Sequence, residues 1–297
     1  MKKKFIVWGH KLHSHTTSYV LYGYLIAFKY LGYDVYHFDE SDDVSNFDFS
    51  DCLFLTEGQV DKNIPIRKDS RYILHNCDAE KYIDAGVDYL NLQVYNVDSD
   101  NNRYSNTIKI DDFVYYHSSD NTLDQPWATN LLPHEVETEL IITRNKTSCF
   151  VGMVWAGVHG NISEITSYAE SCTKHGYLHE DYPPGSMSFE QNRKLIADSE
   201  IAPTVVGVWQ KEHKYIPCRI FKNISYGKLG MTNSETVRDV MEGNIVYDND
   251  PACLVDKYLS TSTELQKQMF RDSAKLVAEE HTYINRIENI LFILNNR

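Results

Sequence analysis

Apolar and polar residues follow one another at the start of the chain in the order strand, loop, helix, strand. The apolar run 5–8 is followed by a polar loop at 9–17, and apolar residues then recur at helical spacing until Gly32 ends the pattern. A second apolar run covers 34–39. This order predicts a βαβ unit with a right-handed crossover.

More short apolar runs, at 51–55, 72–75 and 89–94, are each followed by a polar segment. Such alternation is typical of buried strands, and we expect a doubly wound parallel sheet over residues 1 to about 115. The segment 124–133 then places two prolines around Trp127. This composition predicts an ordered crossing between two domains.

After the crossing the pattern of strands and helices begins again. Strands are expected at 148–152, 204–209, 231–233 and 244–247, and helices at 162–174, 189–199, 219–226, 251–259 and 263–294. The sequence therefore predicts an α/β protein with two Rossmann-like domains. We expect their boundaries at 1–130 and 131–280, followed by a C-terminal helix at 281–297.

Composition and charge narrow the classes of protein to which the chain can belong. A net charge of −13 opposes binding of nucleic acid, whose phosphates require a surplus of Lys and Arg. Six isolated cysteines, without a C-x-x-C pair, predict reduced thiols. We expect neither a signal peptide nor a membrane span. We therefore predict a cytoplasmic protein.

Two cations in the second half are the strongest candidates for ligand binding. Ligands of open parallel sheets bind at loops beyond the carboxyl ends of the strands. Pro217 suits the first turn of a helix, so Arg219 and Lys222 would lie near the positive end of that helix, three residues apart. Two cations and free amides at this end would bind a diphosphate. Solvated surface charges would give the same spacing.

The loop at 9–17 contains three histidines. His10, His13 and His15 suggest zinc, but no carboxylate accompanies them and a loop is a poor frame for a metal site, so no metal is expected. A general base is the better functional prediction for His13 or His15. Glu57, after the third strand, is the reserve candidate. A histidine that only caps the next helix is the alternative for each.

Several motifs are weak or absent. Asp98–Asp100 and Asp248–Asp250 fit the D-x-D pattern of metal-dependent glycosyltransferases, but such triplets arise by chance in a chain with 42 acidic residues. The chain has no G-x-x-x-x-G-K-[ST] loop, no G-x-G-x-x-G after its first strand and no G-x-S-x-G elbow. Kinase, ATPase, dinucleotide oxidoreductase and hydrolase functions therefore lose their main support.

Three segments resemble a known family. The run 215–233, with its Arg219-Ile-Phe-Lys222, resembles the donor-site helix of GT-B glycosyltransferases, in which Arg-x-Phe-Glu and a Gly precede a short strand. The tail 280–291, with His-Thr-Tyr followed by Arg, resembles the ending of CgeB-like, spore-maturation type members. Phe150-Val-Gly152 matches the turn that opens their C-terminal domain.

This resemblance implies two Rossmann-like domains that face a central cleft, with the C-terminal helix crossing back to the first. The C-terminal domain would bind a UDP-, GDP- or TDP-sugar, and the N-terminal domain would bind a glycan or another hydroxyl acceptor. No cofactor or metal would be required. The residues that we expect to bind the donor, from this resemblance or from their place next to the matching motifs, are Gly152, Trp209, Tyr215, Arg219, Lys222, Asn233 and Ser234.

One departure from the family bears on mechanism. Lys222 stands where many members have Glu, and the paired-Glu pattern of retaining enzymes is missing. This favours an inverting transfer, in which His13, His15 or Glu57 takes the proton of the acceptor hydroxyl. The alternatives are a nucleotide-sugar or glycan-binding protein without turnover, and a nucleotide-sugar epimerase.

Overall fold

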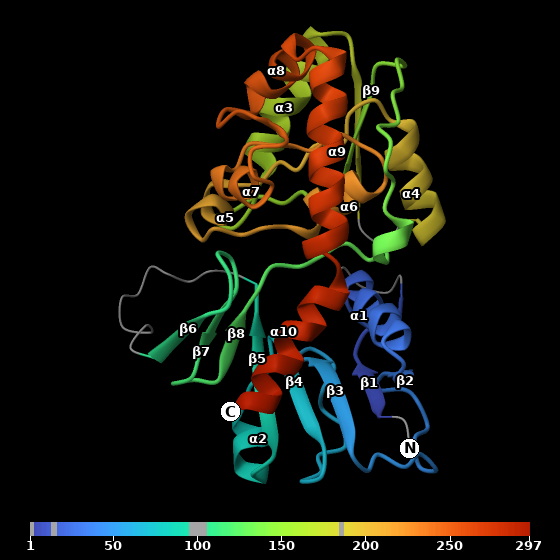
Figure 1. Ribbon diagram of the computed structural model, residues 1–297, viewed down its shortest axis with the longest axis vertical. Coiled ribbons are helices and arrows are strands. Elements are labelled where there is room, and N and C mark those ends of the chain that lie inside the picture. The colour runs from blue at the N-terminus through green and yellow to red at the C-terminus, as the bar shows by residue number, and fades with distance from the viewer. Residues whose placement is uncertain (1–2, 13–16, 95–105, 184–186) are drawn as a thin grey trace. The chain divides into compact units, whose positions relative to one another are not determined.

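The computed structural model describes residues 3–12, 17–94, 106–183 and 187–297. The chain forms two compact units (Figure 1). Unit 1 comprises Met1–Pro126 and Tyr283–Arg297, and unit 2 comprises Trp127–Thr282. The last helix of the chain is thus part of the first unit.

Unit 1 is built on one eight-stranded sheet with the order β2-β1-β3-β4-β5-β8-β7-β6. The strands from β2 to β8 in this order pair in parallel, whereas β7 runs antiparallel to both β8 and β6. The elements of unit 1 are β1 (Lys4–Trp8), α1 (Ser18–Tyr30), β2 (Asp34–Phe38), β3 (Cys52–Glu57), β4 (Arg71–His75), α2 (Glu80–Ala85), β5 (Asp88–Gln93), β6 (Thr107–Lys109), β7 (Tyr115–His117), β8 (Thr122–Asp124) and α10 (Tyr283–Asn296). The parallel sheet predicted from the sequence is confirmed for β1–β5. Its antiparallel extension was not predicted, because strands of three residues are too short to show alternation.

Helices α1 and α10 cover one face of this sheet. Phe5 of β1 stacks on Phe28 of α1, with ring centroids 3.7 Å apart. Gly23 leaves room on α1 for the ring of Tyr283, since a Cβ at Gly23 would lie 2.4 Å from that ring. The buried Arg286 of α10 donates from Nε to the carbonyl oxygen of Pro126 at 2.8 Å. The helix is therefore part of the core of unit 1.

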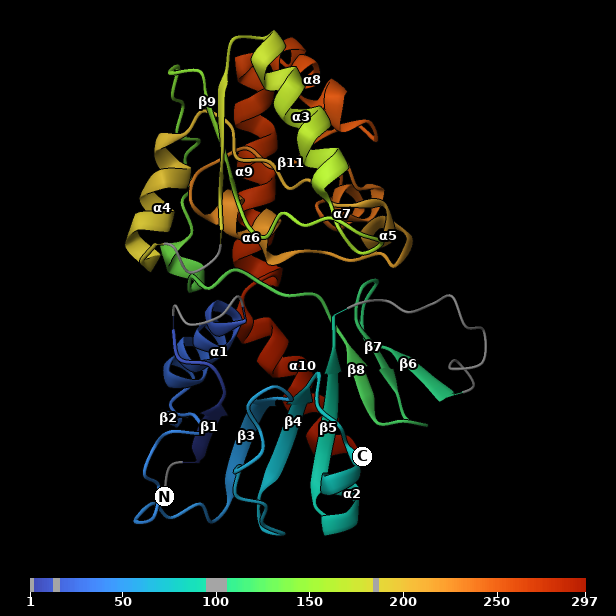
Figure 2. The same ribbon diagram turned by 180° about the vertical axis from the view of Figure 1, so that it is seen from behind.

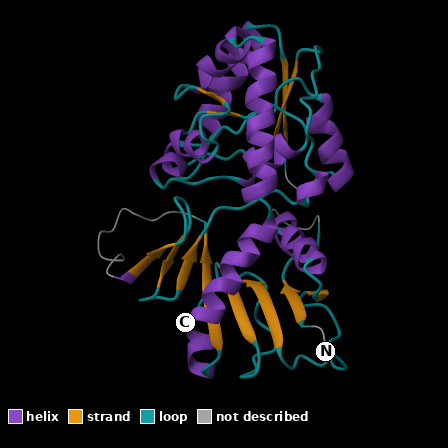
Figure 3. Cartoon of the chain, in the orientation of Figure 1, coloured by secondary structure: helices purple, strands orange, loops and turns teal. Residues whose placement is uncertain are grey.

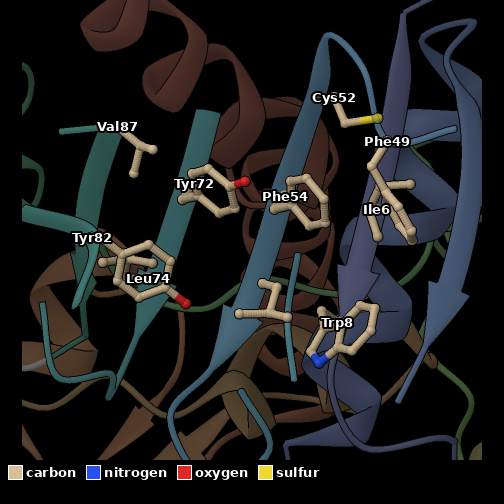
Figure 4. Packing of buried hydrophobic residues seen from close by; sticks show 10 residues of the cluster. Ile6, Trp8, Phe49, Cys52, Phe54, Tyr72, Leu74, Tyr82 and Val87 are labelled. Atoms are coloured by element: carbon tan, nitrogen blue, oxygen red, sulfur yellow. The ribbon is translucent and has the colours of Figure 1, made fainter. Parts of the chain in front are cut away.

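The opposite face carries a second core cluster (Figure 4). It is formed by side chains that alternate with those under α1, and it includes a tyrosine of α2. Its largest buried members are Trp8, Phe49, Phe54, Tyr72 and Tyr82.

Unit 2 contains a sheet of short parallel segments. β10 pairs with β9 and β11 pairs with β12, and isolated parallel bridges join Ser148 to Ile201 and Thr204 to Thr232. The segment 201–204 thus lies between β9 and β11, and all five segments run in one direction. The elements of unit 2 are β9 (Thr147–Val151), α3 (Ile162–Lys174), β10 (Leu178–Tyr182), α4 (Phe189–Asp198), α5 (Val208–Glu212), α6 (Cys218–Ser225), β11 (Met231–Thr232), α7 (Glu235–Val240), β12 (Val246–Tyr247), α8 (Leu254–Ser260) and α9 (Thr263–Glu280), with 3₁₀ turns at Pro133–Glu135 and Pro251–Cys253.

Two predictions for unit 2 are corrected. The strand predicted at 204–209 is reduced to an isolated bridge at Thr204, because the N–H of Gly207 is held by Oε1 of Gln210 at 2.9 Å and α5 begins at Val208. The helix predicted at 263–294 is interrupted between α9 and α10 (Figure 3). Thr282 instead forms a parallel bridge with Thr129, which removes it from the helical conformation.

None of the described helices has the length and hydropathy that a bilayer span requires. All six cysteines are free thiols, and Cys52, Cys149 and Cys172 are buried.

Candidate functional site

The loops that follow the parallel strands of unit 2 meet at one edge of its sheet (Figure 2). They are the loop 152–161 after β9, the start of α5 after the segment 201–206, and the turn 233–234 after β11. The first two are in direct backbone contact, because a Cβ at Gly207 would lie 2.0 Å from the carbonyl oxygen of Gly160. Ligands of parallel α/β sheets bind at this edge.

Arg219 extends from the first turn of α6 to the end of β9. Its Nε donates to the carbonyl oxygen of Val151 at 2.9 Å, and its Cζ lies 3.9 Å from the centroid of the Phe150 ring. Gly152 completes this seat, since a Cβ there would lie 2.0 Å from Nη2 of Arg219. The stack and the hydrogen bond fix the plane of the guanidinium and leave its terminal nitrogens for a ligand with two acceptor oxygens.

Lys222 lies three residues further along the same helix and is partly buried. Burial, together with a smaller effect of the Arg219 charge, lowers the pKa of Lys222 to about 8. Burial also lowers the pKa of Arg219. Within the described residues, no carboxylate forms an ion pair with either side chain, and neither Nζ of Lys222 nor the terminal nitrogens of Arg219 make a hydrogen bond. Desolvated positive charge without a partner is the property of an anion site.

Lys228 is a buried lysine with a structural role, and its contacts differ from those of Lys222. It is 1% exposed, and burial lowers its pKa to about 8 as well. Its Nζ, however, donates to the carbonyl oxygen of Ile141 at 2.8 Å and to Oγ1 of Thr143 at 3.4 Å. These bonds tie the segment 141–143 to the unit, whereas Nζ of Lys222 makes no such bond to any residue that the structure describes.

Two aromatic residues predicted to bind the donor precede α6 in the chain. Trp209 of α5 is partly buried and stacks on His213, with ring centroids 4.0 Å apart, while His159 meets it edge-on at 4.5 Å. Tyr215, between α5 and α6, is partly buried too. The contact with His159 joins α5 to the loop after β9.

Asn233 and Ser234 serve the fold of this edge. The side-chain amide of Asn233 exchanges two hydrogen bonds with the backbone of Val206, both at 2.9 Å. Ser234 caps α7 by accepting the N–H of Val237. Both residues are buried, and these contacts explain their positions without a ligand. Their role in donor binding stays a prediction.

In unit 1, Glu57 stands at the carboxyl end of the central strand β3. It is 1% exposed, and Oγ1 of Thr17 donates to its Oε2 at 2.7 Å. Its register partner on β4 is His75, whose pKa is lowered by burial. Asn76 contacts Nε2 of His75 at 3.1 Å and has the left-handed φ of +52°. Sequence reasoning missed His75, although its place at the end of a predicted strand was a usable signal.

The other candidate catalytic residues cannot be placed. His13 and His15 lie outside the described residues. His10 is described and partly buried, and Glu57 is linked through Thr17 to the far end of the same loop. The structure thus links Glu57 to Thr17, the last residue of the predicted loop.

Only one of the two D-x-D triplets, Asp248–Asp250, lies within the described residues. Asp98 and Asp100 lie outside the described residues. Asp248 accepts the N–H of Asp250, and Asp250 accepts the N–H of Ala252, so this pair shapes a turn. In the described part of the chain, no group of three or more His, Cys, Asp or Glu side chains is arranged to hold a metal ion.

Comparison with known proteins gives matches among solved structures alone. No family model and no curated protein matches the chain. An alpha-glucosyltransferase in complex with UDP is similar at a TM-score of 0.64 and 8% identity, covering 99% of this chain and 100% of the other. Alpha-glucosyltransferase with UDP and a 13-mer DNA containing a HMU base gives 0.66 and 8%, with complete coverage of both chains. A glycosyltransferase from Rickettsia africae ESF-5 gives 0.55 and 12%, again with complete coverage. The chain therefore has the two-unit α/β fold of GT-B glycosyltransferases.

Proposed function

We propose that this protein is a metal-independent glycosyltransferase that uses a nucleoside-diphosphate sugar as its donor. The observation that carries the proposal is the pair Arg219 and Lys222, two desolvated cations that form no ion pair within the described residues, although the charge of Asp181 acts on Arg219. UDP is the first nucleotide to test, because similar structures contain it. GDP and TDP are the alternatives.

The two cations have complementary tasks in this reaction. The guanidinium of Arg219 is planar and would bind two oxygens of the diphosphate at once, while the ammonium of Lys222 acts as a point charge. When the bond between the anomeric carbon and the phosphate oxygen breaks, the leaving diphosphate keeps the electron pair. Cations already in place stabilise that developing charge without a metal ion.

For the attack of the acceptor on the sugar we propose a single inverting displacement. The acceptor oxygen forms the new bond to the anomeric carbon, and its proton passes to a general base. His13, His15 and Glu57 are the proposed bases. A glycan or another hydroxyl compound is the proposed acceptor, because the net charge of −13 opposes binding of nucleic acid, even though two similar structures contain DNA. The CgeB-like resemblance of the tail and a cytoplasmic location also stay predictions.

A thermal-shift panel with UDP, GDP, TDP and CMP in excess EDTA tests the proposal. A ligand at 100 times its dissociation constant adds about 2.7 kcal/mol to the free energy of unfolding. We expect one diphosphate to raise the melting temperature in EDTA and CMP, which has a single phosphate, to do so less. Stabilisation that appears only after manganese is added would contradict a site made of protein cations.

The same samples separate the rival functions. Incubation with the matching nucleotide sugar should release the diphosphate slowly by hydrolysis and faster with an acceptor. An epimerase would convert the sugar nucleotide with no acceptor present. Binding without any turnover of the donor would leave a binding protein as the better description.

A further inference from the structure

The chain passes between the two units twice, after Pro126 and after Thr282. The residues of unit 2 beside these two crossings are joined to each other. The N–H of Thr129 donates to the carbonyl oxygen of His281 at 3.0 Å, and Thr129 pairs with Thr282 in a parallel bridge. We call residues 127–131 and 281–282 the crossing segments.

A directed chain of hydrogen bonds leads from the first crossing segment into α6. Oγ of Ser225 donates to the carbonyl oxygen of Lys222 at 2.8 Å. A hydroxyl has one proton, so the bond of 2.8 Å between Ser225 and Thr129 must be donated by Oγ1 of Thr129. The N–H of Leu131 in turn donates to Oγ1 of Thr129 at 3.3 Å. The chain therefore ends on the backbone of one of the two candidate phosphate ligands.

The second crossing segment touches the same helix. The ring of His281 lies against that of Phe221, with centroids 4.6 Å apart. Further bonds support the end of α6: Tyr226 donates to Oδ1 of Asn130 at 3.0 Å, and the N–H of Glu137 donates to the carbonyl oxygen of Ser225 at 3.0 Å. Arg219 thus lies in the first turn of this short helix, Phe221 in its middle contacts the second crossing segment, and Ser225 and Tyr226 at its end contact the first.

Burial makes these contacts sensitive to small movements of α6. Thr129 and Ser225 are 0% exposed, and Phe221 is fully buried as well. Water cannot replace a broken hydrogen bond of a hydroxyl group at such a buried site. Breaking one bond of the network therefore costs free energy, because it leaves a buried polar group without a partner.

We propose that α6 couples occupancy of the cation pair by a nucleoside diphosphate to the crossing segments, with Thr129 and Ser225 as positioning residues. The inference rests on the proposed function. A ligand that holds Arg219 and Lys222 restricts the motion of α6, and the hydroxyl chain passes that restriction to the crossing segments. The coupling is reciprocal, so rigid crossing segments also favour binding.

Hydrogen exchange of the full-length protein with and without saturating UDP tests this coupling. Coupling energies of ordinary size correspond to factors of about 5 to 150. We expect UDP to slow exchange of the Thr129 and Glu137 amides by about fivefold or more. In Ser225→Ala the slowing at Thr129 should fall below about twofold while UDP still binds.

Ser167→Ala is the matched control, because the hydroxyl of Ser167 also donates within its own helix but lies exposed on α3. It should keep the wild-type response. Thr129→Val removes the same hydrogen bond with little change of shape, and it should behave like Ser225→Ala. Bound UDP with unchanged exchange at Thr129 and Glu137 in the wild-type protein overturns the coupling alone. Failure of UDP, GDP and TDP to bind overturns the proposed function and the coupling together.

Discussion

Replacing the general base should lower the turnover of glycosyl transfer by a factor of about 100 to 10,000 and leave donor affinity nearly unchanged. The reason is that the base touches only the acceptor hydroxyl, whose proton it takes as the new glycosidic bond forms. The donor is bound separately, through Arg219 and Lys222. Transfer rates and UDP dissociation constants of His13→Ala, His15→Ala and Glu57→Gln are the measurements.

The Glu57→Gln variant distinguishes a general base from a residue that only positions the loop, since Glu57 is almost fully buried and accepts a hydrogen bond from Thr17. A glutamine keeps an oxygen that accepts the hydrogen bond from Thr17 but cannot take a proton. A large loss in Glu57→Gln therefore indicates a base, whereas a small loss indicates that Glu57 only positions the loop through Thr17. Near wild-type turnover in all three variants would contradict the inverting mechanism.

Removal of α10 by ending the chain after Thr282 should abolish the folded state. Its five fully buried hydrophobic side chains each contribute about 1.5–3 kcal/mol; they are Tyr283, Ile287, Ile290, Ile293 and Leu294. Together they approach the whole stability of an ordinary domain, about 5–15 kcal/mol. The truncation also uncovers the apolar face of α1, so we expect aggregation in sedimentation velocity and strong binding of a hydrophobic dye.

A pair of substitutions on the same helix serves as a milder version of this test. Ile290 is 0% exposed, and Ile290→Ala should cost about 2–5 kcal/mol in urea unfolding. Phe292 is 53% exposed, and Phe292→Ala should change stability within about 0.5 kcal/mol. A monomeric truncated protein with wild-type activity would show that α10 is dispensable for unit 1.

The sequence predicted those parts of the structure that depend on local pattern. The first βαβ unit and strands β3, β4 and β5 follow from apolar runs that are long enough to read. The spacing of Arg219 and Lys222 on a helix that starts next to Pro217 was also visible. That neither forms an ion pair with any residue the structure describes was not visible, because this depends on which residues the folded chain brings near them.

The errors have tertiary causes as well. The break between α9 and α10 arises because Thr282 pairs with Thr129, more than 150 residues away in the chain. Gly152 lies against Arg219 in the structure, a contact that the sequence did not predict, and its role in donor binding stays a prediction. The aromatic seat that Phe150 provides for this guanidinium could not be inferred from spacing, because the two residues meet only when α6 packs on β9.

The most direct test of the cation pair is calorimetric titration of UDP into the wild-type protein and Arg219→Ala in excess EDTA. Loss of charge-assisted hydrogen bonds typically removes about 1.5 to 3 kcal/mol, so we predict binding weakened about 10- to 150-fold in Arg219→Ala and less in Lys222→Ala. Arg238→Ala is the matched control, because this surface arginine of α7 already pairs with Glu235 and Asp239. An unchanged UDP dissociation constant in a folded Arg219→Ala variant would contradict the assignment of α6 as the donor site.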